Sequence, residues 1–225
     1  MRAVTRQNLP QWLLHIRKLR LPIYLQAKEH VRLSGKGAEI GAGTAWLSAV
    51  ISQNPEVTHI TAIDINPERL KLAENFFLKE FNGQKNKITY RQGDFHQLPF
   101  ADESLDFVVC DAALHHTNQL EKLLTEIKRV LKKGGLLLAI REPVLPSLPV
   151  LGWWRKITFG RRQRRQEDIE HTYYMKEWKN AFQRLGFSFQ ALPYFLTTTR
   201  KERLVKKLSR FNGLLFSRYY FIADK

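Results

Sequence analysis

Cysteine is nearly absent from this chain of 225 residues, in which Cys110 is the single one. Its scarcity excludes a disulfide framework, a cysteine-rich zinc site and an iron–sulfur cluster. Long apolar runs are also lacking, because the longest uncharged stretches, 41–55 and 143–154, fall short of the roughly 20 residues of a membrane-spanning helix. No apolar run follows Arg2 and Arg6, so no signal peptide is expected. We therefore predict a reduced, cytoplasmic protein without a metal site.

Acidic residues are scarce at both ends of the chain. The formal net charge is +16, with 37 Lys and Arg against 21 Asp and Glu. Residues 1–36 hold 8 basic and 1 acidic residue, and residues 144–225 hold 17 and 6, whereas residues 37–143 hold 12 and 14. Basic flanks suit an anionic partner such as a lipid surface, a nucleic acid or a phosphorylated substrate, and they equally suit a solubilising surface.

The first part of the chain has a helical pattern. Leu13, Ile16, Leu19 and Ile23 follow a helical spacing, which predicts a helix over 9–33 that Pro22 kinks. We interpret residues 1–36 as a helical cap and residues 37–225 as the main domain.

From residue 38 onward, short apolar runs alternate with helical segments, which is typical of a parallel sheet covered on both faces. The expected strands are 38–41, 57–64, 88–93, 105–111 and 136–141, and the expected helices are 44–53, 67–81 and 118–131. Asn66 and Pro67 suit the N-cap and first turn of the second of these helices.

Prolines and tryptophans interrupt this rhythm after Glu142, so residues 142–174 are predicted to be an insertion, or lid, over the binding face. A helix at 175–185, a strand near 187–196, a helix near 201–210 and a strand near 214–222 are expected to complete the domain.

The first expected strand leads into a glycine-rich turn, Glu39-Ile40-Gly41-Ala42-Gly43-Thr44-Ala45. Such a turn lets a ligand approach bare backbone at a helix N-terminus, although glycines can also serve a turn alone. A dinucleotide site would carry glycine or alanine where Trp46 stands, and Glu39 would repel a pyrophosphate. A carboxylate there suits a cationic ligand group, such as an ammonium or a sulfonium.

This stretch resembles motif I of the class I S-adenosylmethionine-dependent methyltransferases, in their small-molecule, type 11-like branch. Further blocks follow in the family's order. Ile63-Asp64-Ile65-Asn66 closes the second strand, and a block that begins Gly93-Asp94-Phe95 follows the third. Residues 106–116 resemble the fourth strand and the loop beside the methyl group, and residues 126–135 resemble the helix and turn before the fifth strand. Ala45 stands where the family commonly has glycine.

The resemblance implies a Rossmann-like three-layer α/β sandwich with a mostly parallel seven-stranded sheet whose last strand is antiparallel. It also implies S-adenosyl-L-methionine as cofactor, with Asp64 on the ribose hydroxyls and Asp94 on the adenine amine. Asp94 could also be a turn former alone. The residues expected to bind the cofactor are Glu39, Gly41, Ala42, Gly43, Asp64, Ile65, Gly93, Asp94, Phe95 and Asp111.

Methyl transfer in this family is a direct displacement, so orientation of the acceptor supplies much of the rate and a base is needed only for a protonated acceptor. His115 and His116 lie in the loop that corresponds to the methyl group, and either could take a proton near neutral pH. Either could instead pack or bond within the loop. They are the candidate catalytic residues.

Motifs that the sequence lacks limit the class of methyl acceptor. Asp111-Ala112-Ala113-Leu114 stands where adenine and glutamine N-methyltransferases carry Asn/Asp-Pro-Pro-aromatic, and the Pro-Cys nucleophile of cytosine C5 enzymes is absent. Radical chemistry on this cofactor would need a cysteine cluster. A small or lipid-like acceptor, with an anionic group as one option, is therefore favoured. The alternatives are an RNA methyltransferase that uses the basic flanks and a cofactor-binding protein without catalysis.

The acceptor is expected beneath the insertion at 142–174. Trp153 and its aromatic neighbours adjoin the basic run 155–165, a composition that suits an anionic membrane surface, a nucleic acid or a simple lid. We predict peripheral, salt-sensitive membrane contact for this segment. The residues expected to bind the acceptor are Trp153, His171, Tyr173 and Tyr174.

Overall fold

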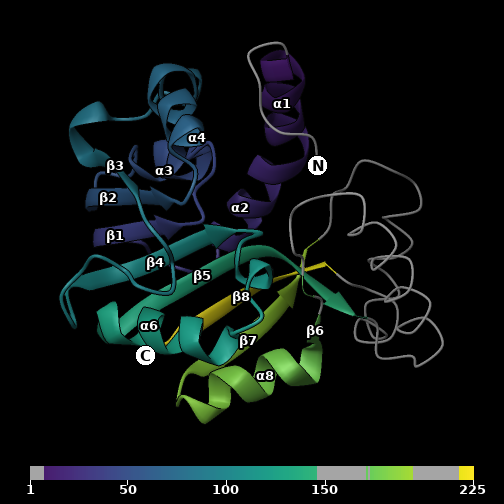
Figure 1. The fold of residues 1–225 in the computed structure, drawn as a ribbon. Helices are drawn as coiled ribbons and strands as arrows, with labels where there is room; N and C mark the ends of the chain where they lie inside the picture. The colour runs from purple at the N-terminus through teal and green to yellow at the C-terminus, as the bar shows by residue number, and fades with distance from the viewer. Residues whose placement is uncertain (1–7, 146–170, 172, 195–217) are drawn as a thin grey trace.

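The computed structural model describes residues 8–145, 171, 173–194 and 218–225. Its centre is a mixed β-sheet with helices on both faces (Figure 1). The strands are β1 (Gly35–Ile40), β2 (Val57–Asp64), β3 (Ile88–Gln92), β4 (Leu105–Asp111), β5 (Leu131–Leu145), β6 (Tyr173–Tyr174), β7 (Ser188–Pro193) and β8 (Arg218–Asp224). The α-helices are α1 (Leu9–His15), α2 (Leu21–Lys28), α3 (Trp46–Ile51), α4 (Pro67–Leu72), α5 (Leu78–Glu80), α6 (Leu120–Val130) and α8 (Met175–Arg184). Shorter π and 3₁₀ segments are η2 (Ile16–Arg20), η3 (Ala73–Phe77), η4 (Lys85–Lys87) and η5 (Leu114–His116).

The strand order is β3-β2-β1-β4-β5-β8-β7. Neighbouring strands from β3 to β5 are parallel, whereas β8 is antiparallel to both β5 and β7. This arrangement confirms the predicted α/β sandwich, with a mostly parallel seven-stranded sheet whose last strand is antiparallel. The two-residue strand β6 is an addition, and it pairs with the end of β5.

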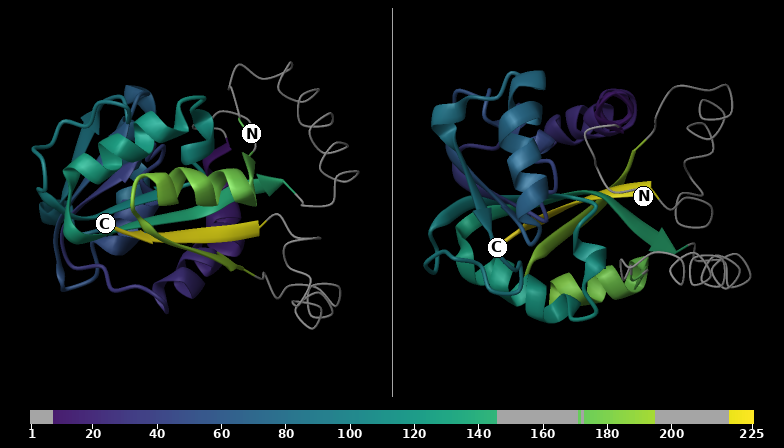
Figure 2. Two further views of the ribbon diagram at one scale, coloured as in Figure 1. Left: turned by 90° about the horizontal axis from the view of Figure 1, so that it is seen from below. Right: turned by 45° about the horizontal axis from the view of Figure 1, so that its top comes forward.

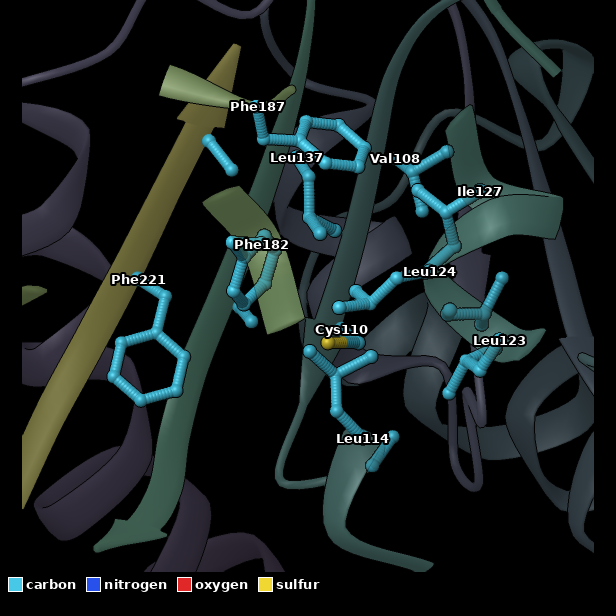
Figure 3. Close-up of a cluster of buried hydrophobic side chains, with 14 of the residues drawn as sticks. Val108, Cys110, Leu114, Leu123, Leu124, Ile127, Leu137, Phe182, Phe187 and Phe221 are labelled. Atoms are coloured by element: carbon cyan, nitrogen blue, oxygen red, sulfur yellow. The ribbon is translucent and has the colours of Figure 1, made fainter. Parts of the chain in front are cut away.

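Side chains of the central strands alternate between two apolar cores. On one face Val108, Cys110 and Leu137 pack against α6 and α8 (Figure 3). On the other face Phe107 and Val109 pack with residues of α2 and α3, and Figure 2 shows these helices on the side of the sheet away from α6 and α8. Burial on both faces explains why these strands are near-continuous apolar runs in the sequence.

The N-terminal helix belongs to the second of these cores. Ile16, Ile23 and Ala27 are buried in the cluster that also contains Ile140 of β5. The helix ends at Lys28, earlier than predicted, and contains the π turn η2 directly before α2. Pro22, which has no N–H to donate, lies just after this π turn, where the regular α-helical hydrogen-bond pattern is already interrupted. Within the described residues, no helix is both long and apolar enough to cross a bilayer.

Local signals account for most element boundaries. The Asn66 side chain accepts hydrogen bonds from the backbone N–H groups of Glu68 (3.0 Å) and Arg69 (3.2 Å), which confirms it as the N-cap of α4. The predicted helix at 44–53 begins only at Trp46, because Ala45 has a left-handed φ of 44°.

Strand β5 is longer than predicted. It runs from Leu131 to Leu145, so residues 142–145 of the expected insertion are strand. Trp153 and the rest of the expected insertion up to residue 170 lie outside the described residues. The predicted helix near 201–210 also lies outside them, and the last strand begins at Arg218.

Candidate functional site

The carboxyl ends of β1, β2, β4 and β5 lie at the same edge of the sheet, and the turn from β1 to α3 forms part of that edge. Gly41 has φ +60°, and a Cβ there would lie 2.7 Å from the Cβ of Ala113. Gly43 has φ +55°, and no atom lies within 4 Å of the place that its Cβ would take. The turn therefore requires glycine at 41 for packing and presents open backbone at 43.

Asp64, at the end of β2, is hydrogen-bonded to this turn. Its Oδ2 accepts a hydrogen bond from the Gly43 N–H at 2.6 Å, and its Oδ1 accepts one from the Asn66 N–H at 2.8 Å. An ionised carboxylate has about four acceptor positions, so each oxygen keeps one for a ligand. Ile65, the next residue, has an apolar side chain that is 72% exposed.

The third block lies on a separate loop. Gly93 donates its N–H to the Asp64 carbonyl at 3.1 Å, which places this loop beside the end of β2. The Asp94 side chain is 57% exposed, and its Oδ1 accepts from the backbone N–H of His96 at 2.8 Å. Burial acts to raise the pKa of Asp94, but the hydrogen bonds from His96 outweigh it and lower that pKa. Phe95 packs partly buried against the core.

Glu39 lies beneath the turn rather than at its surface. The carboxylate is 1% exposed, and its Oε2 accepts from Ser48 N–H at 2.7 Å and from Ser48 Oγ at 2.5 Å. Burial raises the pKa of Glu39 to about 8, although the Ser48 hydrogen bonds act in the opposite direction. The contacts of Glu39 therefore hold α3 onto β1.

Asp111, at the end of β4, is held by two arginines. Its Oδ2 accepts from Arg20 Nη1 at 3.1 Å and from Trp46 Nε1 at 2.9 Å, and its Oδ1 accepts from Arg141 Nε. Burial acts to raise the pKa of Asp111, but the charges of Arg141 and Arg20 outweigh it and lower that pKa. Burial and the same two arginines lower the pKa of His15. Asp111 therefore holds two arginine side chains at this edge of the sheet.

Beside Asp111, the loop after β4 carries His115 and His116, whose ring centroids are 4.3 Å apart. His115 is buried, and its Nδ1 lies 2.8 Å from Oε2 of Glu142, a fully buried residue of β5. The thiol of Cys110 lies 3.8 Å from Glu142 Oε1. Burial, followed by the charge of Glu142, raises the pKa of Cys110 well above its usual value.

Part of the expected acceptor-binding group lies against this loop. The His171 N–H donates to the His115 carbonyl at 2.8 Å, and the Tyr173 hydroxyl donates to the Thr117 carbonyl at 2.8 Å. Tyr174 pairs with Leu145 through β6. Trp153 lies outside the described residues.

Arg20, Arg141 and Glu142 are not among the residues that the sequence predicts for the site. Arg20 is a charged residue within the apolar spacing of the N-terminal helix, and 91 residues separate it from Asp111. Arg141 and Glu142 are two consecutive charged residues at the end of an apolar strand. That position is the one feature of the sequence that could have marked them as site residues.

Comparison with known proteins gives the same assignment. Residues 38–139 match the family model described as "Methyltransferase domain". The uncharacterized methyltransferase YcgJ of Bacillus subtilis (strain 168) is 29% identical over 171 residues, which cover 75% of this chain and 63% of YcgJ. The demethylmenaquinone methyltransferase of Staphylococcus haemolyticus is 30% identical over 58% of this chain and 52% of its own. Phthiotriol/phenolphthiotriol dimycocerosates methyltransferase 1 of Mycobacterium ulcerans is 27% identical over 90% of this chain and 73% of its own.

The solved structure of YcgJ has the same fold, with a TM-score of 0.66 at 22% identity over 91% of this chain and 97% of that chain. The sequence matches to YcgJ and to the demethylmenaquinone enzyme span less than two thirds of those relatives. The fold, the motif order and the family match together place the protein in one class. Residues 38–139 of this chain form a methyltransferase domain of the class I S-adenosylmethionine-dependent family.

S-Adenosylmethionine is the cofactor of this family, and the residues present fit it. Gly43 presents open backbone at the turn, and Asp64 keeps acceptor positions that match two ribose hydroxyls. The exposed Ile65 side chain offers an apolar surface next to Asp64.

Proposed function

We propose that this protein transfers a methyl group from S-adenosylmethionine to a small, lipid-like acceptor that carries an ionisable or anionic group. The observation that carries the proposal is the turn at Gly43, which Asp64 fixes through a 2.6 Å hydrogen bond beside open backbone. When bound, the cofactor supplies an electrophilic methyl group on a sulfonium. The residues of the chain bind it, orient the acceptor and remove a proton where the acceptor carries one.

In this proposal the cofactor residues have different roles. Asp64 accepts from the ribose hydroxyls, and Asp94 accepts from the adenine amine with the oxygen that His96 does not use. The backbone of Gly41, Ala42 and Gly43 approaches the amino-acid part of the cofactor. Ile65, Gly93 and Phe95 surround the adenine. Glu39 and Asp111 act indirectly, because Glu39 is buried against Ser48 and the Asp111 carboxylate is bonded by Arg20, Arg141 and Trp46.

Two observations support the class of acceptor. Two arginine side chains, Arg20 and Arg141, lie at this edge of the sheet, and guanidinium groups suit a ligand with an anionic or acidic group. The names of the relatives from Staphylococcus haemolyticus and Mycobacterium ulcerans give demethylmenaquinone and phthiotriol or phenolphthiotriol dimycocerosates as their acceptors. His171 and Tyr173 contact the His115 loop, and Tyr174 follows them on β6. We assign these three residues, with Trp153, to the acceptor.

Peripheral membrane contact fits a lipid-like acceptor. On the N-terminal helix Leu14 and Leu25 are 52% and 48% exposed, and Arg17, Lys18 and Lys28 are exposed on the same helix. Cations with apolar side chains suit an anionic bilayer surface. The basic run 155–165, outside the described residues, remains a second predicted contact. Co-sedimentation with anionic but not neutral vesicles, lost in high salt, is the expected result, and equal binding to both would contradict it.

Turnover tests the function. Purified protein with cofactor labelled in the methyl group is incubated with a lipid extract, an aqueous extract and a nuclease-treated extract. We expect label in the organic-soluble fraction, insensitive to nuclease. Label that disappears after nuclease treatment would indicate the RNA alternative. Tight cofactor binding without transfer to any extract would indicate a binding protein without catalysis.

A further inference from the structure

The pairing of β5 with β8 contains an irregularity at the edge where the site lies. Ile140 pairs with Tyr220, and the next pair joins Glu142 to Tyr219, so Arg141 is an extra residue on β5. Arg141 has a φ of +62°, a left-handed conformation that costs a non-glycine residue about 1–2 kcal/mol. Such bulges are frequent beside active sites, where they re-aim side chains.

The bulge changes the face on which Glu142 lies. Regular alternation along β5 would place Glu142 with Leu138 and Ile140, toward the N-terminal helix and α3. With Arg141 inserted, Glu142 lies instead on the face of Leu137 and Ala139, where its carboxylate meets the loop after β4. One extra residue therefore brings a carboxylate under the candidate catalytic histidine.

Glu142 is fixed there by backbone donors. Its Oε1 accepts from the N–H groups of Ala113 at 2.9 Å and Leu114 at 3.0 Å, and its Oε2 accepts from the His115 N–H at 3.2 Å. The residue is fully buried. These three bonds leave the carboxylate little freedom, so the fourth contact, at 2.8 Å to His115 Nδ1, has a defined direction.

That contact determines the tautomer of His115. A carboxylate held by N–H donors accepts from Nδ1, so the ring proton lies on Nδ1 and Nε2 keeps its lone pair. Nε2 makes no hydrogen bond to the described residues. We propose that Glu142 is the positioning residue of the active site, which holds His115 as the Nδ1–H tautomer so that Nε2 is the general base. This inference rests on the proposed methyltransferase function.

The proton balance of the step follows from this geometry. Nε2 of His115 takes the proton of the acceptor O–H, and the oxygen electron pair forms the new bond to the methyl carbon. The carbon–sulfur bond breaks with its electron pair going to sulfur, which leaves a neutral thioether. His115 becomes an imidazolium, and the adjacent Glu142 carboxylate offsets that charge. An acceptor that has a proton to lose, such as a phenol or an enol, is the class that makes use of this pair.

The first test needs neither cofactor nor acceptor. Ring-nitrogen NMR of the full chain labelled with ¹⁵N-histidine, assigned with His115→Asn, should show His115 with a protonated Nδ1 and an unprotonated Nε2 at mildly alkaline pH. In Glu142→Gln this preference should be lost or reversed. Wild-type His115 protonated on Nε2 would overturn the inference.

The second test uses turnover on the labelled extract fraction. His115→Asn keeps a donor near the position of Nδ1 but has no Nε2, so the loop should remain folded while turnover falls by about 10²–10⁴-fold. Glu142→Gln should fall by a comparable factor with cofactor affinity retained. Glu121→Gln, an exposed carboxylate on α6, is the matched control and should keep full turnover. Full turnover in His115→Asn or Glu142→Gln would overturn the inference.

The two tests separate failure of the inference from failure of the function. An Nδ1–H tautomer that depends on Glu142, in a protein that transfers no label to any extract, would support the positioning and contradict the methyltransferase proposal. Turnover at the wild-type rate in Glu142→Gln would support the methyltransferase proposal and contradict the positioning role of Glu142. If Glu142→Gln unfolds, Glu142→Asp keeps the charge and shortens the side chain, and an intermediate turnover is then expected.

Discussion

The two halves of the site treat their carboxylates differently. At the ends of β2 and β3, Asp64 and Asp94 use part of their acceptor capacity on backbone N–H groups and keep the rest. At the ends of β4 and β5, the carboxylates of Asp111 and Glu142 each have three or more hydrogen-bond partners, which include the side chains of Arg20, Arg141 and His115. The first half is built to receive hydrogen bonds from a ligand. In the second half, arginine and histidine side chains are the groups offered to a ligand, and the carboxylates hold these side chains in place.

Breaking the buried network of the second half should have the largest effect. Asp111→Ala would leave Arg20 and Arg141 close together and without their shared partner, so the free energy of unfolding should fall by about 3–5 kcal/mol. Urea denaturation followed by circular dichroism measures it. Asp102→Ala removes one of the two carboxylate partners of Arg129 at an exposed site and should cost at most about 1 kcal/mol. Equal losses in the two variants would show that the buried network is not coupled.

Glu39, near the end of β1, is buried, and its hydrogen bonds described above come from Ser48, a neutral residue. Its pKa is about 8 in the folded protein and about 4.3 in an unfolded chain. Folding therefore takes up a proton between these values, and stability falls as the pH rises through that window. The loss should be at most about 1.4 kcal/mol per pH unit. Glu39→Gln has no such titration, so denaturation at about pH 5 and about pH 8 should show the wild type losing stability relative to the variant. A difference that does not change with pH would contradict the burial argument.

Substitutions in the first half should lower the affinity for the ligand more than the stability of the fold. Asp64→Ala removes charged hydrogen-bond acceptors, so calorimetry should show S-adenosylmethionine affinity lower by about 1.5–3 kcal/mol, that is, at least tenfold. Asp94→Ala should lose less, about 0.5–1.5 kcal/mol, because the exposed site leaves water to replace the contact. Unchanged affinity in Asp64→Ala would show that the ribose is held elsewhere. Denaturation of the same variants checks that any loss is not unfolding.

The same contrast explains what sequence could and could not predict. The bounds of β2 and β4 agree with their apolar runs, because both strands are buried on both faces. Asp64 follows from its place at the end of a strand after a glycine-rich turn. Glu142 does not follow from any local pattern, since its face depends on a bulge at a position occupied by arginine rather than glycine. Arg20 reaches Asp111 only through the packing of a distant helix. Sequence thus indicates Asp64, Asp111 and His115, whereas tertiary structure is needed to find the residues that bond to Asp111 and His115, which are Arg20, Arg141 and Glu142.

The smallest expected effect compares two alanines with left-handed backbone, one in each half. Ala45 has φ 44° and Ala112 has φ 55°. Replacement by glycine relieves about 1–2 kcal/mol of strain at either site, but it adds about 0.4–1 kcal/mol of unfolded-chain entropy. At Ala45, which is 1% exposed, the lost methyl burial costs about 0.8 kcal/mol more, so the terms cancel and stability should stay within about 0.5 kcal/mol of wild type. Ala112 is only half-buried, so Ala112→Gly should gain about 0.5 kcal/mol. Thermal and urea denaturation of both variants measure the difference, and a larger gain at Ala45 than at Ala112 would show that the buried methyl group contributes less than this balance requires.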